Sequence, residues 1–477
     1  MSVAKAPQVG RVRALRYNRP NVSSRRLTAA LEYAARCGLL LAATLAPSPL
    51  AAQTGGAPTA PSPAPAAPSS PLPSWLQVHA EHRTRYESVD VRYRANEVGA
   101  DQQLDFRTRL QVRLTAPHAF GYAEIQDSRI ALNDSASTVG ISQVLDTHVL
   151  QLHGGLNWKD LGDRHLGVQI EAGRFSRDFG FRRVISRSIY RNTTNAFDGV
   201  IGRVSGATWN VQALAFRPVL YVYPSLDRDP RYTRLRVGGL YATSTRWKAA
   251  NADIYGLVWH DGTAAPAASR RALTTVGARV FGQVGRSRRA EYEVETAVQR
   301  GEVGPLTHRA WFNHTQAGYT WTAAWRPRLL ALFDYASGDA DPRDDVSGAY
   351  DLLLGARRFE FGPMGIHGLI PRSNIVSPGV WLIVRPVAAF ESGLQLRGMY
   401  LAEARDRWRT TALVDPTGAA GRHVGEQLEW RNRYRFTPHL EFDGGLTVFR
   451  EGPFVKRLRP GSSGRSVHLY AGLEVKY

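Results

Sequence analysis

The sequence contains a single cysteine, Cys37, among 477 residues. An intramolecular disulfide is therefore excluded, and so is a zinc site built from cysteines. Cys37 precedes the short apolar stretch near the N-terminus, whereas a lipid-anchoring cysteine would follow such a stretch. We therefore do not expect lipidation.

Long hydrophobic runs are also missing. No apolar run approaches the roughly 18 residues that a membrane-spanning helix needs. Disorder does not fit either, because 43% of the residues are hydrophobic and 10% are aromatic. The mean hydropathy of −0.30 is typical of soluble proteins. A porin-type barrel also reaches such a value, because half of each strand faces water inside the pore.

Acidic residues are scarce relative to basic ones, at 41 against 61, which gives a net charge of +20. Such an excess suits nucleic acid, an anionic membrane surface or an acidic polymer. The first 52 residues contain eight Lys and Arg and one acidic residue, which leaves 53 basic and 40 acidic residues, or +13. The main part of the chain is therefore basic in its own right.

Catalytic patterns are absent from the sequence. It has no G-x-S-x-G, H-E-x-x-H or phosphate-loop motif, and its 13 histidines lack metal-ligand spacing. We therefore predict no enzyme, cofactor or metal site. An outer-membrane hydrolase remains the enzymatic alternative, and it would need a Ser–His pair near the barrel rim. The acidic cluster at residues 339–345 lacks the EF-hand spacing, so we interpret it as a solvated loop.

The N-terminal region has the order of a signal peptide. Scattered basic residues up to Arg36 precede the apolar segment 38–46 and the small residues that end at Ala52. This order predicts a signal peptide over residues 1–52 rather than a basic tail. Residues 53–74 are rich in Pro, Ala and Ser, which predicts a disordered linker. Residues 75–477 show no further break in composition, so we predict a single domain there.

That domain has the periodicity of strands. In residues 103–115, Leu104 and Leu110 alternate with Arg107, Arg109 and Arg113. Successive residues of a strand point to opposite faces, so one face is apolar and the other charged. The pattern recurs at 291–299, 428–436 and 440–448. A soluble sandwich would alternate too, but segments of about nine to eleven residues are long enough to cross a bilayer at a tilt.

Aromatic residues lie near the ends of these segments. Trp321 with Trp325, and Tyr255 with Trp259, are expected in interfacial girdles. The sequence ends on an alternating strand that closes with Tyr477, similar to the signal read by the outer-membrane assembly machinery, although phenylalanine is the usual last residue. We predict an all-β fold, a single antiparallel transmembrane barrel of about 18 strands in a Gram-negative outer membrane.

Several sequence blocks lie in a fixed order along this domain. Residues 173–183 read GRFSRDFGFRR, followed by YRN at 190–192 and AFDGV at 196–200. Later blocks are GYTW at 318–321, DYASGD at 334–339, LLGARRF at 353–359, RSN at 372–374, GEQLE at 425–429 and FREGPF at 449–454. In order and spacing these blocks resemble the alginate export family of outer-membrane barrels. The resemblance covers most of residues 75–477.

The resemblance implies a monomeric outer-membrane barrel. A member of that family exports alginate, a polymer of uronic acids, through a pore lined with arginines. The function that it implies here is conduction of an anionic substrate, with export of alginate or a similar anionic exopolysaccharide favoured. The alternative is a general anion-selective porin for uptake of small acidic nutrients or sugars.

Arginine suits such a pore because its guanidinium stays charged and pairs bidentately with carboxylates. The alternative for each arginine is a pairing with acidic residues of the lumen, such as Glu291, Glu293 and Glu295. Asp198 either orients an arginine or forms a turn. The predicted pore-lining residues are Arg107, Arg109, Arg113, Arg174, Arg183, Arg191, Arg203, Asp198, Arg357, Arg372, Arg431 and Arg433.

The expected partners follow from this interpretation. They are an anionic polysaccharide or small anions, outer-membrane lipid, the barrel assembly machinery and, for export of a polymer, periplasmic export proteins. A nucleic-acid partner would explain the charge. It would not explain the signal peptide or the regular alternation, and we do not expect one.

Overall fold

The computed structural model describes residues 72–477 except 96, 98, 135–136, 138, 164, 222–233, 248, 263–269, 357, 364–365 and 412. The predicted signal peptide, most of the predicted linker and Arg357 lie outside the described residues. The boundaries proposed for the signal peptide and the linker stay predictions.

The described chain consists almost entirely of strands, with the alternating segments forming their centres. The strands are β1 (Leu76–Val89), β2 (Asp101–Thr115), β3 (Ala119–Ala131), β4 (Leu145–Leu161), β5 (Leu166–Phe175), β6 (Phe197–Ser205), β7 (Trp209–Pro218), β8 (Leu235–Trp247), β9 (Ala250–Asp261), β10 (Arg271–Val284), β11 (Ala290–Val303), β12 (Leu306–Thr320), β13 (Arg328–Ala336), β14 (Val346–Ser347), β15 (Ile375–Val387), β16 (Phe390–Tyr400), β17 (His423–Thr437), β18 (Leu440–Glu451) and β19 (Arg465–Lys476). The two short helices are α2 (Arg358–Phe361) and α3 (Pro453–Leu458).

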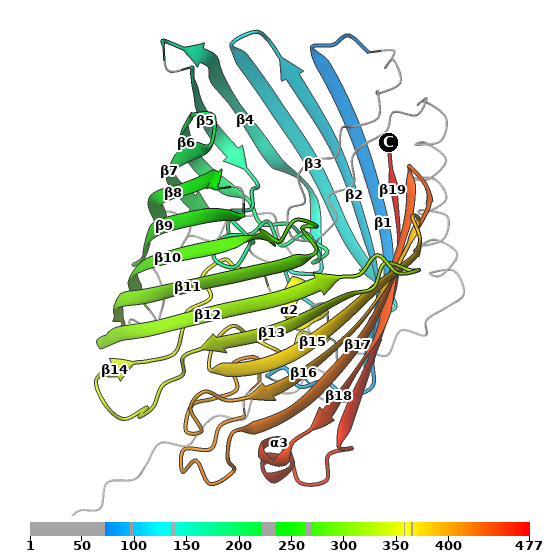
Figure 1. The fold of residues 1–477 in the computed structure, drawn as a ribbon. Helices are drawn as coiled ribbons and strands as arrows, with labels where there is room; N and C mark the ends of the chain where they lie inside the picture. The colour runs from blue at the N-terminus through cyan, green and yellow to red at the C-terminus, as the bar shows by residue number, and fades with distance from the viewer. Residues whose placement is uncertain are drawn as a thin grey trace, which may run out of the picture. The chain divides into compact units, whose positions relative to one another are not determined.

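The strands close into a barrel (Figure 1). Apart from β14, each strand pairs antiparallel with its neighbours in sequence, and β1 pairs with both β2 and β19. The two-residue β14 pairs parallel with β12 and is not a member of this ring, which leaves 18 barrel strands. Tyr477 extends the closing ladder through two backbone hydrogen bonds with Ala80, at 2.9 and 3.0 Å. The predicted all-β fold and strand number are confirmed.

The two faces of the wall differ as the alternation predicts. On β2, Leu110 and Leu114 are 45% and 46% exposed, whereas Arg107 and Arg109 are buried. The exposed apolar set continues around the barrel, for example at Leu152 on β4. Arginine on the lipid face would cost roughly 2–4 kcal/mol at the bilayer midplane. The apolar face is therefore the outside of the barrel and the charged face lines its lumen.

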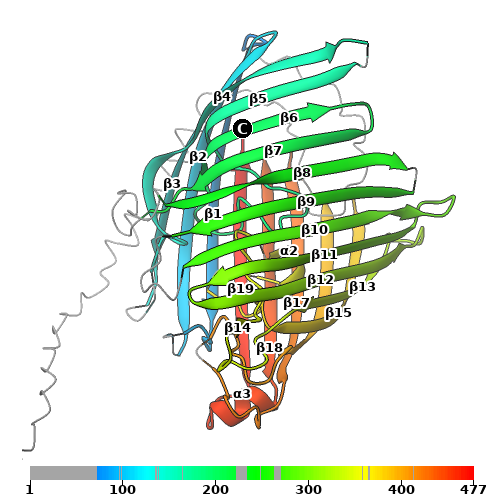
Figure 2. The same cartoon turned by 90° about the vertical axis from the view of Figure 1, so that its left-hand side faces the viewer.

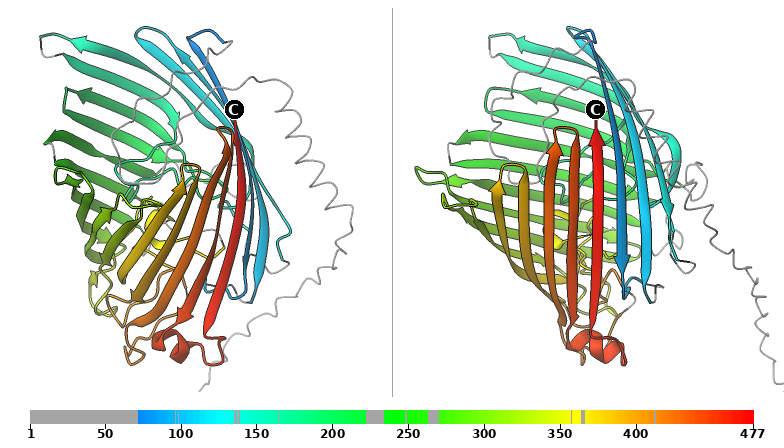
Figure 3. Two further views of the ribbon diagram at one scale, coloured as in Figure 1. Left: turned by 45° about the vertical axis from the view of Figure 1, so that its right-hand side comes forward. Right: turned by 90° about the vertical axis from the view of Figure 1, so that its right-hand side faces the viewer.

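The connections at the two ends of the barrel differ in length. The register of β1 with β19 places the start of the first strand beside the end of the last one. Connections at that end are short, such as residues 388–389 and 438–439. Connections at the other end, where α3 lies (Figure 3), are long, such as residues 337–374 and 401–422. Outer-membrane barrels have short periplasmic turns, so we assign the short-turn end to the periplasm.

Two long connections fold into the barrel instead of standing above it. The first inner loop is residues 176–196, between β5 and β6, and the second inner loop is residues 348–374, the part of the β13–β15 connection that follows β14. Their apolar residues are buried, as Val184 and Ile370 show. Figure 2 shows α2, part of the second inner loop, behind the strands of the near wall. No helix in the described part of the chain is long and apolar enough to cross a membrane.

Candidate functional site

The first inner loop is held against β1 and β2 by two arginines that stand directly opposite each other. Arg83 and Arg107 are register partners and both are buried. Arg83 donates to the carbonyl oxygens of Ile189 and Arg191 at 3.1 and 3.0 Å. Arg107 donates to the same two oxygens at 2.5 and 3.2 Å. Opposed like charges repel, and the carbonyl dipoles of the loop offset this repulsion.

Arg107 and Arg109 share a carboxylate. Glu81 on β1 lies 2.7 Å from Arg107, and its other oxygen binds Arg109. Arg109 also lies 3.5 Å from Glu124 on β3. Both arginines therefore face the lumen as the alternation predicts, and their charges are balanced by the wall. Whether they contact a substrate stays a prediction.

Arg183 of the first inner loop is the centre of a buried ion-pair network. Its guanidinium lies 2.5 Å from Glu293 and also binds Glu295 and Glu360. Although burial opposes the charge, Glu293 and then Glu295 raise the pKa of Arg183 above its ordinary value. The β11 glutamates therefore hold a loop arginine against the wall, as the sequence suggested for this acidic strand. Its third member, Glu291, binds Arg328 on β13.

Glu360 joins the two inner loops. Its carboxylate binds Arg183 of the first loop and Arg372 of its own loop. Burial, and then repulsion by Arg183, lowers the pKa of Arg372 to about 10, so this side chain is still protonated at neutral pH. Backbone pairing between Ile185 and Leu354 joins the loops a second time. The two loops therefore form one unit inside the barrel.

Three other predicted residues form ion pairs on the wall. Arg174 and Asp198 are register partners on β5 and β6 and bind bidentately, at 2.7 and 2.9 Å. They alternate with the buried Phe175 and Phe197, and Arg174 also pairs in register with Leu152, which is 61% exposed. This ion pair therefore lies on the outward face of the wall and not in the lumen, where it was predicted. Asp198 therefore orients an arginine and does not form a turn. Arg431 binds Asp443 on β18 in the same way, at 3.0 and 2.7 Å.

Arg433 on β17 is held more loosely, toward the periplasmic end of the lumen. Its guanidinium lies 3.7 Å from Glu391 and 3.6 Å from Glu441. Arg113, near the same end, is exposed and lies over the ring of Phe120, with 5.4 Å between the guanidinium carbon and the ring centre. These two side chains keep more freedom than the arginines beside the inner loops.

Arg191 and Arg203, like Arg113, form no ion pair with any described carboxylate. Arg191 donates to Asn195 at 2.5 Å, and Arg203 on β6 donates to Gln212 at 3.1 Å. Burial alone lowers the pKa of Arg191 to about 10, which still leaves it protonated at neutral pH. Each therefore adds an unbalanced positive charge to the lumen.

Strands β6 to β10 give the inner wall an apolar sector. Tyr241 and Tyr255 stack with their ring centres 5.5 Å apart, and Phe179 of the first inner loop lies 6.1 Å from Tyr241. Ile185 of the same loop belongs to this buried cluster. One side of the first inner loop is therefore fixed by apolar packing and the other by arginines.

The predicted place of Tyr255 and Trp259 in an outer girdle is wrong. Both are buried on the inner face of β9, at 2% and 4% exposure, whereas Ile254 and Val258 between and beside them face outward. Nearness to a strand end does not determine which face an aromatic ring occupies; its place in the alternation does. Trp325, in the turn between β12 and β13, is 61% exposed, as a girdle position requires.

Three side chains in the lumen lie close enough to be considered as metal ligands: His314, Asp334 and Glu360. The carboxylate oxygens of Asp334 and Glu360 already bind guanidinium groups, however. Asp334 lies 2.7 Å from Arg397, and Glu360 binds Arg183 and Arg372. A cation at this point would compete with three guanidinium groups, so the geometry favours an ion-pair network.

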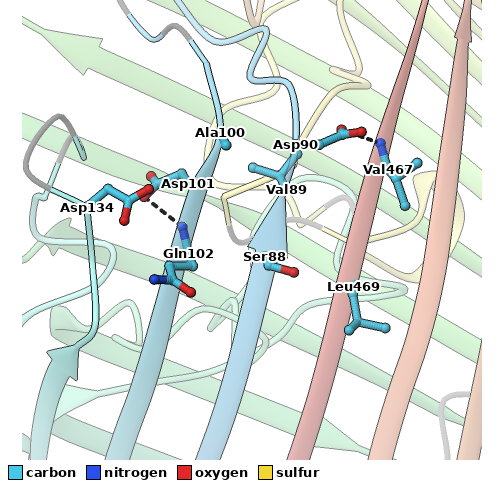
Figure 4. A pocket seen from close by; sticks show the side chains of 9 residues that line it. All are labelled: Ser88, Val89, Asp90, Ala100, Asp101, Gln102, Asp134, Val467 and Leu469. Carbon is cyan, nitrogen blue, oxygen red and sulfur yellow. Dashed lines mark hydrogen bonds between the residues drawn. The ribbon is translucent and has the colours of Figure 1, made fainter. Parts of the chain in front are cut away.

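A pocket of about 430 Å³ lies on the wall near the extracellular end rather than in the lumen. Ser88, Gln102 and Leu469 form one cross-strand row on the outward face beneath it. Figure 4 shows Asp90 at its edge, where the carboxylate accepts a hydrogen bond from the backbone of Val467 at 2.6 Å. This contact ties the beginning of β19 to the end of β1.

Comparison with protein families identifies the chain. Residues 74–468 match the model of the alginate export family. The chain belongs to this family. Family and fold together make it an outer-membrane β-barrel channel of the Gram-negative type. No curated protein sequence gives a significant match.

Two solved structures have a similar fold at low sequence identity. The chain is similar to OccAB1 of Acinetobacter baumannii, with a TM-score of 0.56 and 11% identity. This similarity covers 84% of the present chain and 96% of OccAB1. The chain is also similar to OccD3 (OpdP) of Pseudomonas aeruginosa, with a TM-score of 0.55, 10% identity, and coverage of 85% and 91%. At such identities these similarities concern the barrel alone.

A pair of buried histidines attaches the second inner loop to the wall. His367 of the loop and His468 of β19 stack with ring centres 5.0 Å apart. Around them lie Gln427, 3.4 Å from His367, and Glu87, 3.5 Å from His468. Burial, and then His468, lowers the pKa of His367 well below its ordinary value of 6.5, with Arg94 adding to the effect and Glu87 opposing it.

We expect acidification to loosen the second inner loop. A histidine kept neutral in the packed loop takes up a proton in the released loop once the pH falls below about 6.5, so the proton favours release. The shift is at most about tenfold per pH unit. Limited proteolysis between about pH 7.5 and 5 should show faster cleavage within residues 348–374 at the lower pH. His367→Gln should remove this difference, and a dependence that survives in the variant would assign it to other groups.

Sequence reasoning missed several residues of this site. Arg83 was available from the alternation of β1, where Glu81, Arg83, Arg85 and Glu87 share one face. Arg397 on β16 carried a similar local signal, because Gln395 and Arg397 alternate with the exposed Leu394 and Leu396. The inner position of the two loops had none at all.

Proposed function

We propose that this channel conducts an anionic substrate and that it exports alginate or a similar anionic exopolysaccharide. The family supports a polyuronate as the substrate class. The observation that carries the proposal is that three arginines on or beside the first inner loop have no carboxylate partner among the described residues: Arg83, Arg191 and Arg203. The ion-paired arginines cannot attract an anion without first giving up a carboxylate, whereas these three supply net positive charge.

The chemistry of these side chains suits a carboxylated polymer. A guanidinium stays charged at neutral pH and forms two parallel hydrogen bonds with a carboxylate. Arg83 and Arg191 belong to β1 and the first inner loop, and Arg203 to β6 beside that loop. A passing uronate therefore meets positive charge on both the wall and the loop, while the lumen carboxylates limit how tightly it binds.

The inner loops affect the direction of transport and the size of the substrate that can pass. Because the two loops occupy the lumen together, a polymer requires them to move. Export also requires periplasmic partners that deliver the polymer, as the sequence interpretation proposes. The alternative is a porin for small acidic nutrients or sugars. The two loops that occupy the lumen favour this alternative, since small solutes pass a filled lumen more readily than a polymer chain does.

Reversal potentials across a potassium chloride gradient test the anionic substrate class. We expect the wild-type channel to favour chloride, more strongly in dilute salt, because lumen charge is screened over about 8–10 Å at physiological salt. Arg191→Gln with Arg203→Gln should weaken this preference. Arg236→Gln with Arg246→Gln removes the same charge from the outward face of β8 and should leave it unchanged. A cation-selective wild-type channel would contradict the proposal.

Uronate oligomers of increasing length separate export from small-solute uptake. In a polymer channel, longer oligomers added on the periplasmic side should block the current for longer, because each added carboxylate meets a further arginine. In a small-anion porin, monomers should pass and oligomers should be excluded without prolonged block. The second result would replace export by uptake and leave the anionic substrate class standing.

A further inference from the structure

Two pairs of arginines face each other on the outside of the barrel near its extracellular end. Arg300 on β11 is the register partner of Arg309 on β12, and Arg450 on β18 is the register partner of Arg465 on β19. All four side chains are exposed, and their neighbours in sequence point into the barrel. Like charges directly opposite each other destabilise a sheet. Strand pairing alone therefore gives no reason for either pair.

The described residues give these four charges no ion-pair partner. No carboxylate among the described residues forms an ion pair with any of the four, and Arg300 donates only to the carbonyl oxygen of Gln299, at 3.2 Å. One acidic side chain on the same face is Glu302, two residues beyond Arg300. Two others lie near the second pair. Glu426, the register partner of Arg450, lies 2.7 Å from His423, and Asp90, opposite Val467, accepts a hydrogen bond from the backbone of Val467.

The first pair lies just beyond the aromatic belt. Trp311, two residues from Arg309 on the same face, is 43% exposed and stacks on Tyr335 with ring centres 4.3 Å apart. Outward tryptophan and tyrosine mark the headgroup level of a membrane. Two strand residues span about 6.6 Å. The Arg300–Arg309 pair therefore lies among the headgroups and not among the acyl chains.

The second pair has the same position relative to the apolar band. Val448 precedes Arg450 on the outward face of β18, and Val467 follows Arg465 on the outward face of β19. Leu469 continues this apolar row and is 45% exposed. Both pairs therefore mark the upper edge of the lipid-facing band, on different sides of the barrel.

We propose that each arginine pair binds a phosphate group of the phosphorylated lipid in the outer leaflet. Directly opposed residues have Cβ atoms about 4.5–5.5 Å apart, so two guanidinium forks can hold one phosphate between them. A phosphate bound between the two arginines attracts both guanidinium groups and so offsets their mutual repulsion. In a bilayer without phosphorylated lipid the repulsion within each pair remains. The two sites therefore also favour insertion into a membrane that contains this lipid. This inference does not depend on the substrate of the channel.

Native mass spectrometry of the folded full-length protein in detergent, titrated with diphosphorylated lipid A, tests the proposal. Arg300→Gln with Arg309→Gln, and Arg450→Gln with Arg465→Gln, should each weaken binding at the substituted site by about 10- to 30-fold, as the loss of two charges facing an anionic lipid surface gives, and lower the number of tightly bound lipids from two to one. Arg246→Gln with Arg286→Gln removes two charges from the periplasmic end and should change binding by less than about twofold. Heat-modifiable electrophoretic mobility shows that each variant is folded.

Two further arms identify what is recognised. Dephosphorylated lipid A should bind the wild type no better than it binds the variant that lacks all four arginines. Inorganic phosphate at the lipid concentration should leave the lipid bound, because the acyl chains add contacts with the apolar wall. The proposal is overturned by wild-type affinity in the four-residue variant, by an equal loss in the periplasmic control, or by displacement with inorganic phosphate.

Discussion

A chain truncated after Gly464, which removes β19, is expected to lose the ability to form the barrel. Strand β19 pairs with β18 on one side and with β1 on the other, so its loss opens two strand edges. Unpaired backbone groups cannot face lipid, where each costs several kcal/mol. Refolding into detergent followed by electrophoresis without heating should show no fast-migrating form.

A smaller truncation is the control for this experiment. Removing Tyr477 alone deletes two backbone hydrogen bonds with Ala80 and leaves the rest of the β1–β19 ladder in place. That protein should refold with normal heat modifiability in vitro. Normal refolding of the longer truncation would show that the barrel closes by another pairing.

The substitution Arg183→Ala is expected to release the inner loops and raise the conductance of the channel several-fold. Arg183 is 1% exposed and binds three carboxylates, those of Glu293, Glu295 and Glu360. Breaking a buried ion pair by removing one partner costs roughly 3–5 kcal/mol, because the other partner is left as an unpaired charge. This free-energy cost falls on the packed state of the loops and exceeds the contribution of any single loop contact. The loops should therefore leave the lumen.

Two further variants make the Arg183 experiment specific. Arg182→Ala changes the adjacent residue, which pairs with Asp178 at 3.1 Å at the partly exposed side of the loop, and should alter conductance little. Adding Glu360→Gln to Arg183→Ala also deprives Arg372 of its carboxylate partner, so the double variant should stay open. The non-additive part of this double change measures the coupling between the loops. Unchanged conductance in Arg183→Ala would mean that other contacts hold the loops.

The strands of this protein follow from sequence because their signal is local. Between residues 103 and 115, alternation alone predicts both the strand and which side chains face inward, since a membrane barrel leaves arginine only one acceptable side. The pairing of Glu81 with Arg109 is nearly as accessible, because they are register partners in the hairpin of β1 and β2. Hairpin register follows from the connecting turn and the apolar pattern.

The inner loops do not follow from sequence, because their partners are distant along the chain. Arg183 and Glu360 are 177 residues apart, and no local pattern connects them. Val184 and Ile185 are two apolar residues in an arginine-rich segment and resemble an ordinary surface loop. The error at Tyr255 and Trp259 has a different origin, since their place in the alternation of β9 already puts both rings on the inner face. Which arginines remain unbalanced could not be predicted without the packing of the inner loops.

The second inner loop also changes the mechanics of the closed ring. Its Ile366 donates a backbone hydrogen bond to Glu87 on β1 at 3.0 Å, and its His367 stacks on His468 of β19. These two strands form the seam at which the first and last strands meet. The loop is therefore an internal brace across the joint, and a force that parts the seam must also break contacts inside the lumen. Each opening of the pore that withdraws this loop leaves the joint held by its ladder alone, so the wall is weakest against lateral separation at the moment when the channel is widest.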